Sequence, residues 1–105
     1  MRLVPDSGHL YFLILGRAYF FLGDSASALL YLRQAVARNP DNLEVRIFLA
    51  AALVRAGRRD DAAWEVGEIR TLDPSFGIRE WLKTYPMSDA RQIRQLADAM
   101  ASLGL

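Results

Sequence analysis

The stretch Leu10–Pro40, LYFLILGRAYFFLGDSASALLYLRQAVARNP, decides the fold. It predicts two antiparallel helices with a tight corner at Gly23 and Asp24, because a glycine can take the positive φ that ends a helix and turns the chain. Gly16 and Ala28 carry little or no side chain where the two helices would cross, so the helix axes can approach closely. The stretch therefore predicts a helical hairpin with a close crossing near its middle.

The pattern of this stretch returns further along the chain, at an offset of 34 residues. The pairs related by this offset are Leu15 and Leu49, Gly16 and Ala50, Gly23 and Gly57, Ala28 and Ala62, Leu32 and Val66, Ala35 and Ile69, and Pro40 and Pro74. Each pair occupies a position with a steric role, at a crossing or at a helix end. The matches therefore indicate an internal repeat, which in this size range is typical of helical solenoids.

The period and spacing are similar to those of the tetratricopeptide repeat, whose pattern is aromatic-x2-Leu-Gly-x2-Tyr, then Ala-x3-Phe, then Pro. The first copy supplies Phe12, Leu15, Gly16 and Tyr19, then Ala28 and Leu32, then Pro40. The second copy is looser, with Arg46, Ala50 and Leu53 at the aromatic, glycine and tyrosine positions. The resemblance implies antiparallel helix pairs stacked side by side.

We expect an all-α fold, a solenoid fragment of antiparallel helix-pair repeats with a C-terminal capping helix, in a single domain over residues 1–105. The first repeat is expected at about 9–42, the second at about 43–75, and the capping helices at about 76–103. The expected helices are Gly8–Leu22, Ser25–Arg38, Asn42–Ala56, Arg59–Leu72, Phe76–Thr84 and Asp89–Ser102. The expected N-terminal caps are Asp6 or Ser7 for the first helix, Asp41 or Asn42 for the third, and Ser88 for the last.

After Pro74 the repeat pattern stops, and Pro86 interrupts the helix that a third copy would need. The last expected helix is amphipathic, as a terminal cap requires. Its apolar stripe is Ile93, Leu96, Ala97, Met100 and Leu103, and the residues expected to face water are Arg91, Gln92, Arg94, Gln95 and Asp98. Trp64 and Gly67 lie off the apolar stripe of the fourth helix, and we expect them to receive the element that follows.

The segments PSFGIREWLKTYP and RQLADAMASLGL, within residues 74–105, resemble the C-terminal region that follows tetratricopeptide repeats in bacterial class III adenylate cyclases and related multidomain regulators. The resemblance implies a regulatory or dimerising region of a larger bacterial signalling protein. The catalytic carboxylates of that family have no counterpart here, so the chain itself is expected to be non-catalytic. Leu3–Pro5 resembles Leu72–Pro74, the end of a repeat, which suggests that the chain follows a preceding repeat.

Composition excludes several classes of function. A net charge of +1 provides no strong field for nucleic acid, so no nucleic-acid partner is expected. The apolar run Leu10–Leu22 is interrupted by Arg17 and is too short to span a bilayer, so no membrane insertion is expected. The absence of cysteine excludes disulfides and thiolate chemistry and fits a reducing, cytoplasmic setting.

Residues that could support catalysis or metal binding are few, and no cofactor or metal site is expected. His9 is the only histidine, and near a helix start it is expected to decorate the surface. Asp60, Asp61, Glu65 and Glu68 could attract a cation but also suit the first turns of a helix, whose N-terminus favours carboxylates. Arg55, Arg58 and Arg59 could meet an anion but equally suit a solvated helix end.

The strongest functional signal is the inner face of the first helix of each pair, where repeats of this kind bind peptides or helices. The expected protein-binding groove is lined by Leu10, Leu13, Ile14, Arg17, Phe21, Glu44, Ile47, Phe48, Ala51 and Arg55. Leu13 and Ile14 stand where a clamp for a C-terminal carboxylate would need polar residues, which argues against that role. The expected occupant is a protein or peptide, or a second copy of this chain. The alternatives are cover by a neighbouring repeat or by the chain's own last helix, and a structural spacer without a ligand.

Overall fold

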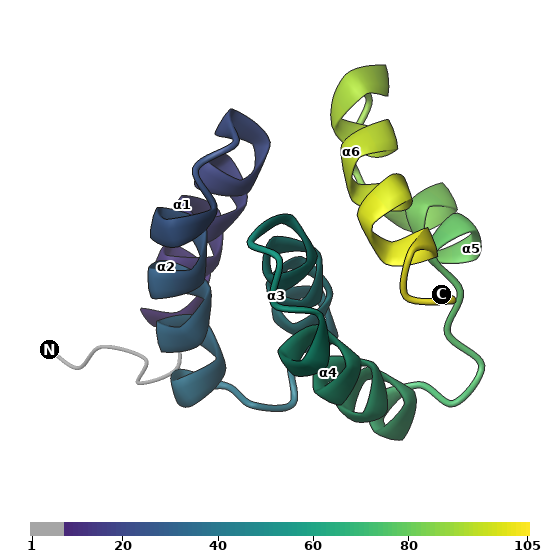
Figure 1. The fold of residues 1–105 in the computed structure, drawn as a ribbon, viewed down its shortest axis with the longest axis horizontal. Helices are drawn as coiled ribbons and strands as arrows, with labels where there is room; N and C mark the ends of the chain where they lie inside the picture. The colour runs from purple at the N-terminus through teal and green to yellow at the C-terminus, as the bar shows by residue number, and fades with distance from the viewer. Residues whose placement is uncertain (1–7) are drawn as a thin grey trace, which may run out of the picture.

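The computed structural model describes residues 8–105, and within that range it contains helices and no strand. The six helices are α1 (Gly8–Leu22), α2 (Ser25–Arg38), α3 (Leu43–Arg55), α4 (Arg59–Leu72), α5 (Ile78–Thr84) and α6 (Ala90–Ala101). Figure 1 shows two antiparallel pairs, α1 with α2 and α3 with α4, followed by α5 and α6. The all-α helix-pair expectation is confirmed. The predicted caps Asp6 and Ser7 and the segment Leu3–Pro5 lie outside the described residues.

The first pair depends on a close crossing at Gly16. A Cβ atom built on Gly16 would lie 2.5 Å from Cγ of Leu32, closer than two carbon atoms can approach. Leu32 is fully buried and Ala28 beside it is also inaccessible, so neither the side chain nor the helix has room to move away. The prediction of a close crossing at Gly16 is confirmed.

The corners of both pairs have the same construction. Gly23 and Gly57 have φ values of 84° and 77°, which an L-residue rarely adopts, and each ends the first helix of its pair. Asp24 then caps α2 by accepting a hydrogen bond from the backbone N–H of Ser27 at 3.1 Å. That bond and a second one from the Ser27 hydroxyl lower the pKa of Asp24.

The caps of later helices fit the predictions in part. Asn42, one of the two caps expected for α3, accepts a hydrogen bond from the backbone N–H of Val45 at 3.0 Å. The expected cap Ser88 is wrong, because Asp89 accepts from the N–H groups of Arg91 and Gln92 instead. A carboxylate at this position also meets the positive end of the helix dipole, which strengthens the cap.

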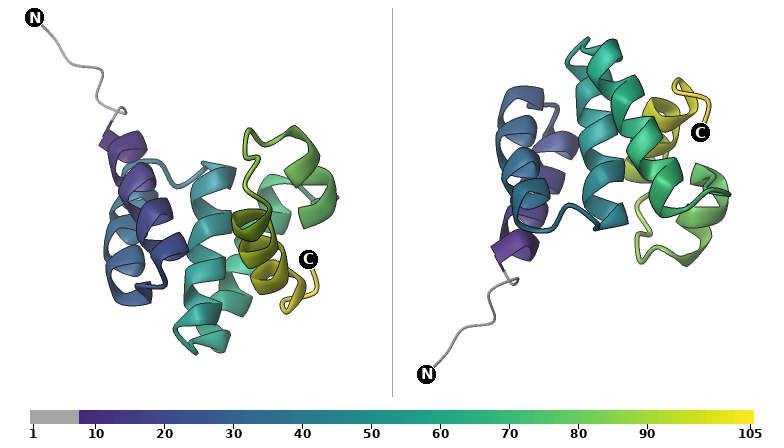
Figure 2. Two further views of the ribbon diagram at one scale, coloured as in Figure 1. Left: turned by 90° about the horizontal axis from the view of Figure 1, so that it is seen from above. Right: turned by 90° about the horizontal axis from the view of Figure 1, so that it is seen from below.

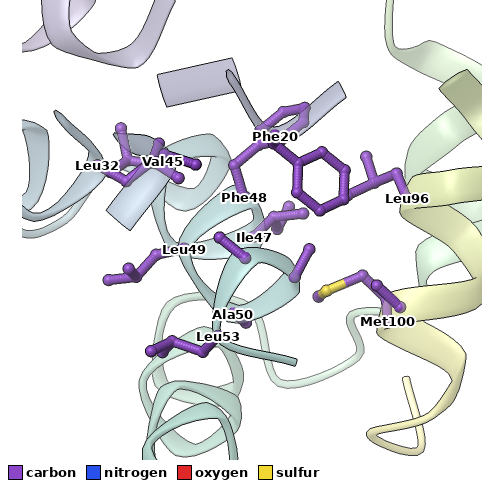
Figure 3. Close-up of a cluster of buried hydrophobic side chains, with 14 of the residues drawn as sticks. Phe20, Leu32, Val45, Ile47, Phe48, Leu49, Ala50, Leu53, Leu96 and Met100 are labelled. Carbon is purple, nitrogen blue, oxygen red and sulfur yellow. The ribbon is translucent and has the colours of Figure 1, made fainter. Parts of the chain in front are cut away.

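Helix α3 is the centre of the molecule. Every residue from Val45 to Leu53 is buried, which is possible only for a helix covered on all sides. The two views of Figure 2 show α3 between the α1–α2 pair and α6, with α4 alongside it. In Figure 3, Leu96 and Met100 of α6 extend towards α3 and meet the group around Phe48 and Phe20.

Helix α6 therefore packs on α3, with α5 against α6, and α4 is left open on its far side. The expectation that Trp64 and Gly67 receive the next element is wrong: Trp64 is 61% exposed, and no atom lies within 4 Å of a Cβ built on Gly67. The predicted apolar stripe of α6 is confirmed in part: Leu96 and Met100 are fully buried, whereas Ile93, Ala97 and Leu103 are only partly buried. Ala99, which was not in the predicted stripe, is buried as well. The cap covers the inner helix of the second repeat and leaves the outer one exposed.

The second repeat contains a buried ion pair where the first has Phe12. Nη1 of Arg46 lies 3.1 Å from Oε1 and 3.2 Å from Oε2 of Glu65 on α4, and Arg46 Nε donates to the Pro40 carbonyl. Burial raises the pKa of Glu65, and the nearby Arg46 opposes that shift. The guanidinium also lies 5.9 Å from the ring centroid of the exposed Trp64. An arginine thus replaces the repeat's aromatic residue and joins α3 to α4.

The crossing at Gly16 predicts opposite effects of two alanine substitutions. Gly16→Ala should destabilise the chain by about 1–3 kcal/mol, because the new methyl group overlaps Leu32. Gly67→Ala, in the open interior of α4, should stabilise it by up to about 1 kcal/mol because alanine favours helix. Urea unfolding followed by circular dichroism measures both. A Gly16→Ala chain as stable as the unmodified chain would contradict the close crossing.

The buried ion pair predicts strong coupling between its partners. Arg46→Met should cost about 3–5 kcal/mol, because Glu65 is left charged and buried, whereas Arg46→Met combined with Glu65→Leu should cost much less. The exposed pair Arg58–Asp61 is the control, and Arg58→Met should cost less than about 1 kcal/mol.

The stability loss caused by Arg46→Met should depend on pH. The raised pKa of Glu65 means that the folded state holds this proton more tightly than the unfolded state, so protonation favours folding. The deficit of Arg46→Met should therefore shrink as the pH falls from neutral towards 4.5, the ordinary value for a glutamate. Urea midpoints measured across this range test it, and a deficit that does not change with pH would show that Glu65 is already neutral or solvated.

Candidate functional site

The ten residues predicted to line the groove divide into two groups. Leu13, Ile47, Phe48 and Ala51 are buried inside the chain, so their placement on an open groove surface has to be corrected. The reason is the position of α6, which covers the inner face of α3. Rings of Phe20, Phe21 and Tyr85 surround Phe48 at centroid distances of 6.0, 5.8 and 6.1 Å, and no part of its side chain reaches the surface.

The remaining residues lie at or near the surface on the inner side. Leu10 and Ile14 are 49% and 57% exposed, one turn apart on α1. Phe21 is half-buried further along the same side of the helix, and Arg55 is exposed at the end of α3. The predicted inner face is thus accessible along α1, while on α3 only its two ends, at Glu44 and Arg55, approach the surface.

A groove runs between α1 and α6. It consists of two adjoining hollows of about 500 and 460 Å³ that share Phe21, Asp89 and Gln92. The first hollow is lined by Ile14, Arg17, Ala18, Phe21, Tyr85, Pro86, Met87, Ser88, Asp89 and Gln92. The second is lined by Phe21, Arg55, Asp89, Arg91, Gln92, Arg94, Gln95 and Asp98. The first hollow therefore combines apolar residues with polar ones, whereas the second is lined mostly by charged and amide side chains.

One wall of this groove was not expected from the sequence. The polar side of α6, predicted to face open water, borders the second hollow through Arg91, Arg94 and Asp98. An amphipathic pattern shows which side of a helix avoids the core, but it cannot show whether the other side meets bulk solvent or a partly enclosed groove. The feature of the sequence that could have indicated this wall is the high proportion of charged and amide residues on that side of α6.

A three-residue cluster holds the start of the α5–α6 connection against both repeats. Arg17 of α1 lies 3.1 Å from Glu44 of α3, and Tyr85 joins them, accepting a hydrogen bond from Arg17 and donating one to Glu44. Burial, reinforced by the Glu44 carboxylate, raises the pKa of Tyr85 to about 12, so the phenol stays protonated at neutral pH. The Trp81 ring stacks on Tyr85 at a centroid distance of 4.4 Å. This cluster fixes where α6 begins and thereby the width of the groove.

The histidine and two of the acidic residues considered as possible catalytic or metal-binding groups lie next to side chains of the chain itself. His9 is 8% exposed, so its expected surface position is wrong, and its Nε2 lies 3.4 Å from Nδ2 of Asn39. Glu65 and Glu68 both lie near Arg46. Among residues 8–105, no group of three or more acidic, histidine or cysteine side chains is arranged to hold a metal ion. No helix in the described part of the chain is long and apolar enough to cross a membrane.

The repeated hairpins, their glycine corners and the amphipathic terminal helix define a helical-repeat scaffold. Residues 12–74, more than half of the chain, match the family model described as tetratricopeptide repeat, and the chain belongs to this family. No curated protein and no solved structure matches the chain. Tetratricopeptide repeats are protein–protein interaction modules and are generally non-catalytic. The matched range ends before α5 and α6, so the wall formed by α6 lies outside the repeats.

The cluster at Tyr85 predicts a local effect on α6. Tyr85→Phe removes both hydrogen bonds and leaves the ring in place, so it should destabilise the chain by about 1 kcal/mol and loosen the connection to α6. Hydrogen exchange should accelerate at residues 85–92, with little change in α2. Tyr11→Phe is the control, because Tyr11 is exposed and its hydroxyl makes no hydrogen bond within the described chain. Equal exchange at residues 85–92 in both variants would contradict the role of the cluster.

Proposed function

We propose that this chain is a non-catalytic protein-interaction module that binds a protein or peptide segment in the groove between α1 and α6. The observation that carries the proposal is the apolar row along the inner side of α1, in which Leu10 and Ile14 are exposed and Phe21 is half-buried. Ile14 and Phe21 line the groove itself. The row borders a groove on the side where repeats of this family bind their partners. Arg17 is the only charged side chain on α1, and Glu44 pairs with it.

The apolar row is large enough to matter for binding. Fully burying an exposed side chain of this size contributes about 1.5–3 kcal/mol. Because Leu10 and Ile14 are only about half exposed and Phe21 is half-buried, the row offsets a part of the roughly 4–15 kcal/mol that association costs, and the rest of the groove has to contribute as well. Isolated exposed apolar residues are ordinary on protein surfaces, whereas a row beside a hollow is typical of an interface.

We further propose that the module belongs to a larger bacterial signalling protein, where it regulates or dimerises a catalytic domain such as an adenylate cyclase. Support comes from the resemblance of residues 74–105 to the segment that follows the repeats in those proteins, and from the absence of catalytic residues in the chain. A cytoplasmic location goes with this proposal. The sequence neighbouring this chain in its gene tests it, and a gene encoding no signalling domain would contradict it.

A second function is favoured by a different surface. Tyr11 and Leu22 are exposed on α1 away from the groove, and Leu30 is exposed on α2, so a further helix pair or a second copy could cover this end. If only this end is used, the chain is a structural spacer or a dimerisation element without a ligand of its own. The groove and the end surface are separate, so variants can distinguish the two functions.

Panning a random peptide display library against the intact chain tests the groove. We expect enriched peptides whose binding falls by at least about tenfold in Ile14→Asp, because a buried charge replaces an apolar contact. Trp64→Asp is the matched control, since Trp64 is equally exposed but lies on α4. Sedimentation velocity of the same samples shows whether a second copy competes for the surface.

Failure of the proposal has a clear signature. If no peptide is enriched, or if Ile14→Asp leaves binding unchanged, the groove is not the binding site. A chain that dimerises through Leu22 and binds no peptide would instead support the spacer or dimerisation function.

A further inference from the structure

The two ends of the groove differ in chemistry. At one end, the apolar side chains of Ile14, Ala18 and Met87 lie beside polar residues, and the only arginine there, Arg17, is paired with Glu44. At the other end, guanidinium groups of Arg55, Arg91 and Arg94 border a hollow of about 460 Å³. Phe21 lies between the two ends and borders both hollows. A segment lying along the groove therefore meets apolar surface first and positive charge next.

The three arginines are not neutralised by the chain itself. Within residues 8–105, Arg55, Arg91 and Arg94 form no ion pair, although they come from two helices that are distant in sequence. The Arg55 guanidinium lies 5.3 Å from the ring centroid of Phe20, which holds it over the inner side. By contrast Arg17, at the apolar end, is already paired with Glu44.

The two acidic residues at this end offset only part of the positive charge, because three arginines face two carboxylates and a formal charge of +1 remains. Asp89 is engaged as the cap of α6, accepting from the N–H groups of Arg91 and Gln92. Asp98 lies two turns further along α6, beyond Arg94, and forms no ion pair with it. The polar end thus keeps a surplus of positive charge.

We propose that the partner segment is an acidic amphipathic one, with bulky apolar side chains at the Ile14–Met87 end and carboxylates at the Arg55–Arg91–Arg94 end. This inference rests on the proposed function of the groove and specifies its ligand. Guanidinium groups match carboxylates in bidentate hydrogen bonds, and complementary charge at the rim of an apolar contact sets specificity and association rate.

In this proposal α6 has two roles, covering the core and recognising the partner, and its amphipathic pattern suggests only the first. The helix closes the core through Leu96 and Met100 and contributes two of the three recognition arginines through its opposite side. Because α6 lies outside the matched repeats, this part of the specificity is a property of this chain's C-terminal helix.

Three synthetic peptides test the proposal by fluorescence anisotropy with the intact chain. Each is an amphipathic helix former of about four turns with the same leucine row, and they carry Glu, Gln or Lys at the flanking positions. We expect the Glu peptide to bind at least about tenfold more tightly than the Lys peptide, with an advantage that decreases as ionic strength rises. Vesicles containing phosphatidylserine serve as a competing anionic surface.

Charge reversal supplies the matched variants. Arg91→Glu with Arg94→Glu should remove or invert the preference for the Glu peptide. Arg70→Glu with Arg79→Glu changes the net charge equally on exposed residues outside both hollows and should preserve it. Arg91 lies in the first turn of α6, where glutamate is favoured by the helix dipole, so the groove variant should stay folded. Circular dichroism and the urea midpoint confirm this.

The outcomes separate the inference from the proposed function. Equal binding of all three peptides, lost in Ile14→Asp, would overturn the acidic partner and leave the groove as an apolar site. Preference for the Lys peptide, or equal loss in both double variants, would also overturn it. Tight binding to the vesicles without binding to the Glu peptide would assign the arginines to a lipid surface. If no peptide binds, the acidic partner is wrong, and the library panning then decides whether the groove binds any peptide.

Discussion

The structure depends on the complete burial of α3. Apart from Arg46, which is paired with Glu65, the residues from Val45 to Leu53 are apolar around the whole circumference of α3, so this helix has to be covered from every direction. The α1–α2 pair, α4 and α6 each supply one cover, and this requirement draws α6 onto α3 and away from α4. The same placement sets α6 opposite α1, with a hollow on each side of Phe21. The candidate binding site is thus a by-product of covering the central helix.

The buried pair of Arg46 and Glu65 shows how one repeat differs from the next. In the first repeat, Phe12 stacks against Tyr31 of α2, and this contact is apolar. In the second repeat, a charged pair occupies the junction of α3 and α4, and the Pro40 carbonyl takes up a further guanidinium donor. Such a pair contributes little net stability, but a wrong helix register would leave both charges unpaired. It therefore favours one arrangement of α3 against α4.

Much of the fold could be predicted from sequence because the signals were local. The 34-residue offset, the glycine corners and the small residue at Gly16 each act over a single hairpin. The placement of Phe48 and Trp64 could not be predicted, because it depends on which helix α6 covers. The sequence pattern of an apolar stripe is the same whether the stripe faces a ligand groove or the chain's own last helix. For the same reason the sequence indicated the exposed side of α1 correctly, missed the wall formed by α6, and gave no sign that Arg46 would be buried with Glu65.

The two opposite sides of α6 are chemically independent. Leu96 and Met100 hold the helix on α3, whereas Arg91 and Arg94 make no contact that the core requires. Substitutions on the outward side can therefore accumulate during evolution at almost no cost to folding, while those on the inward side are purged. Related chains that diverge in what they recognise should vary along α6 at every third or fourth position and keep the positions between them constant. If α6 forms the proposed binding wall, recognition can change on one side of this helix while its other side continues to cover α3.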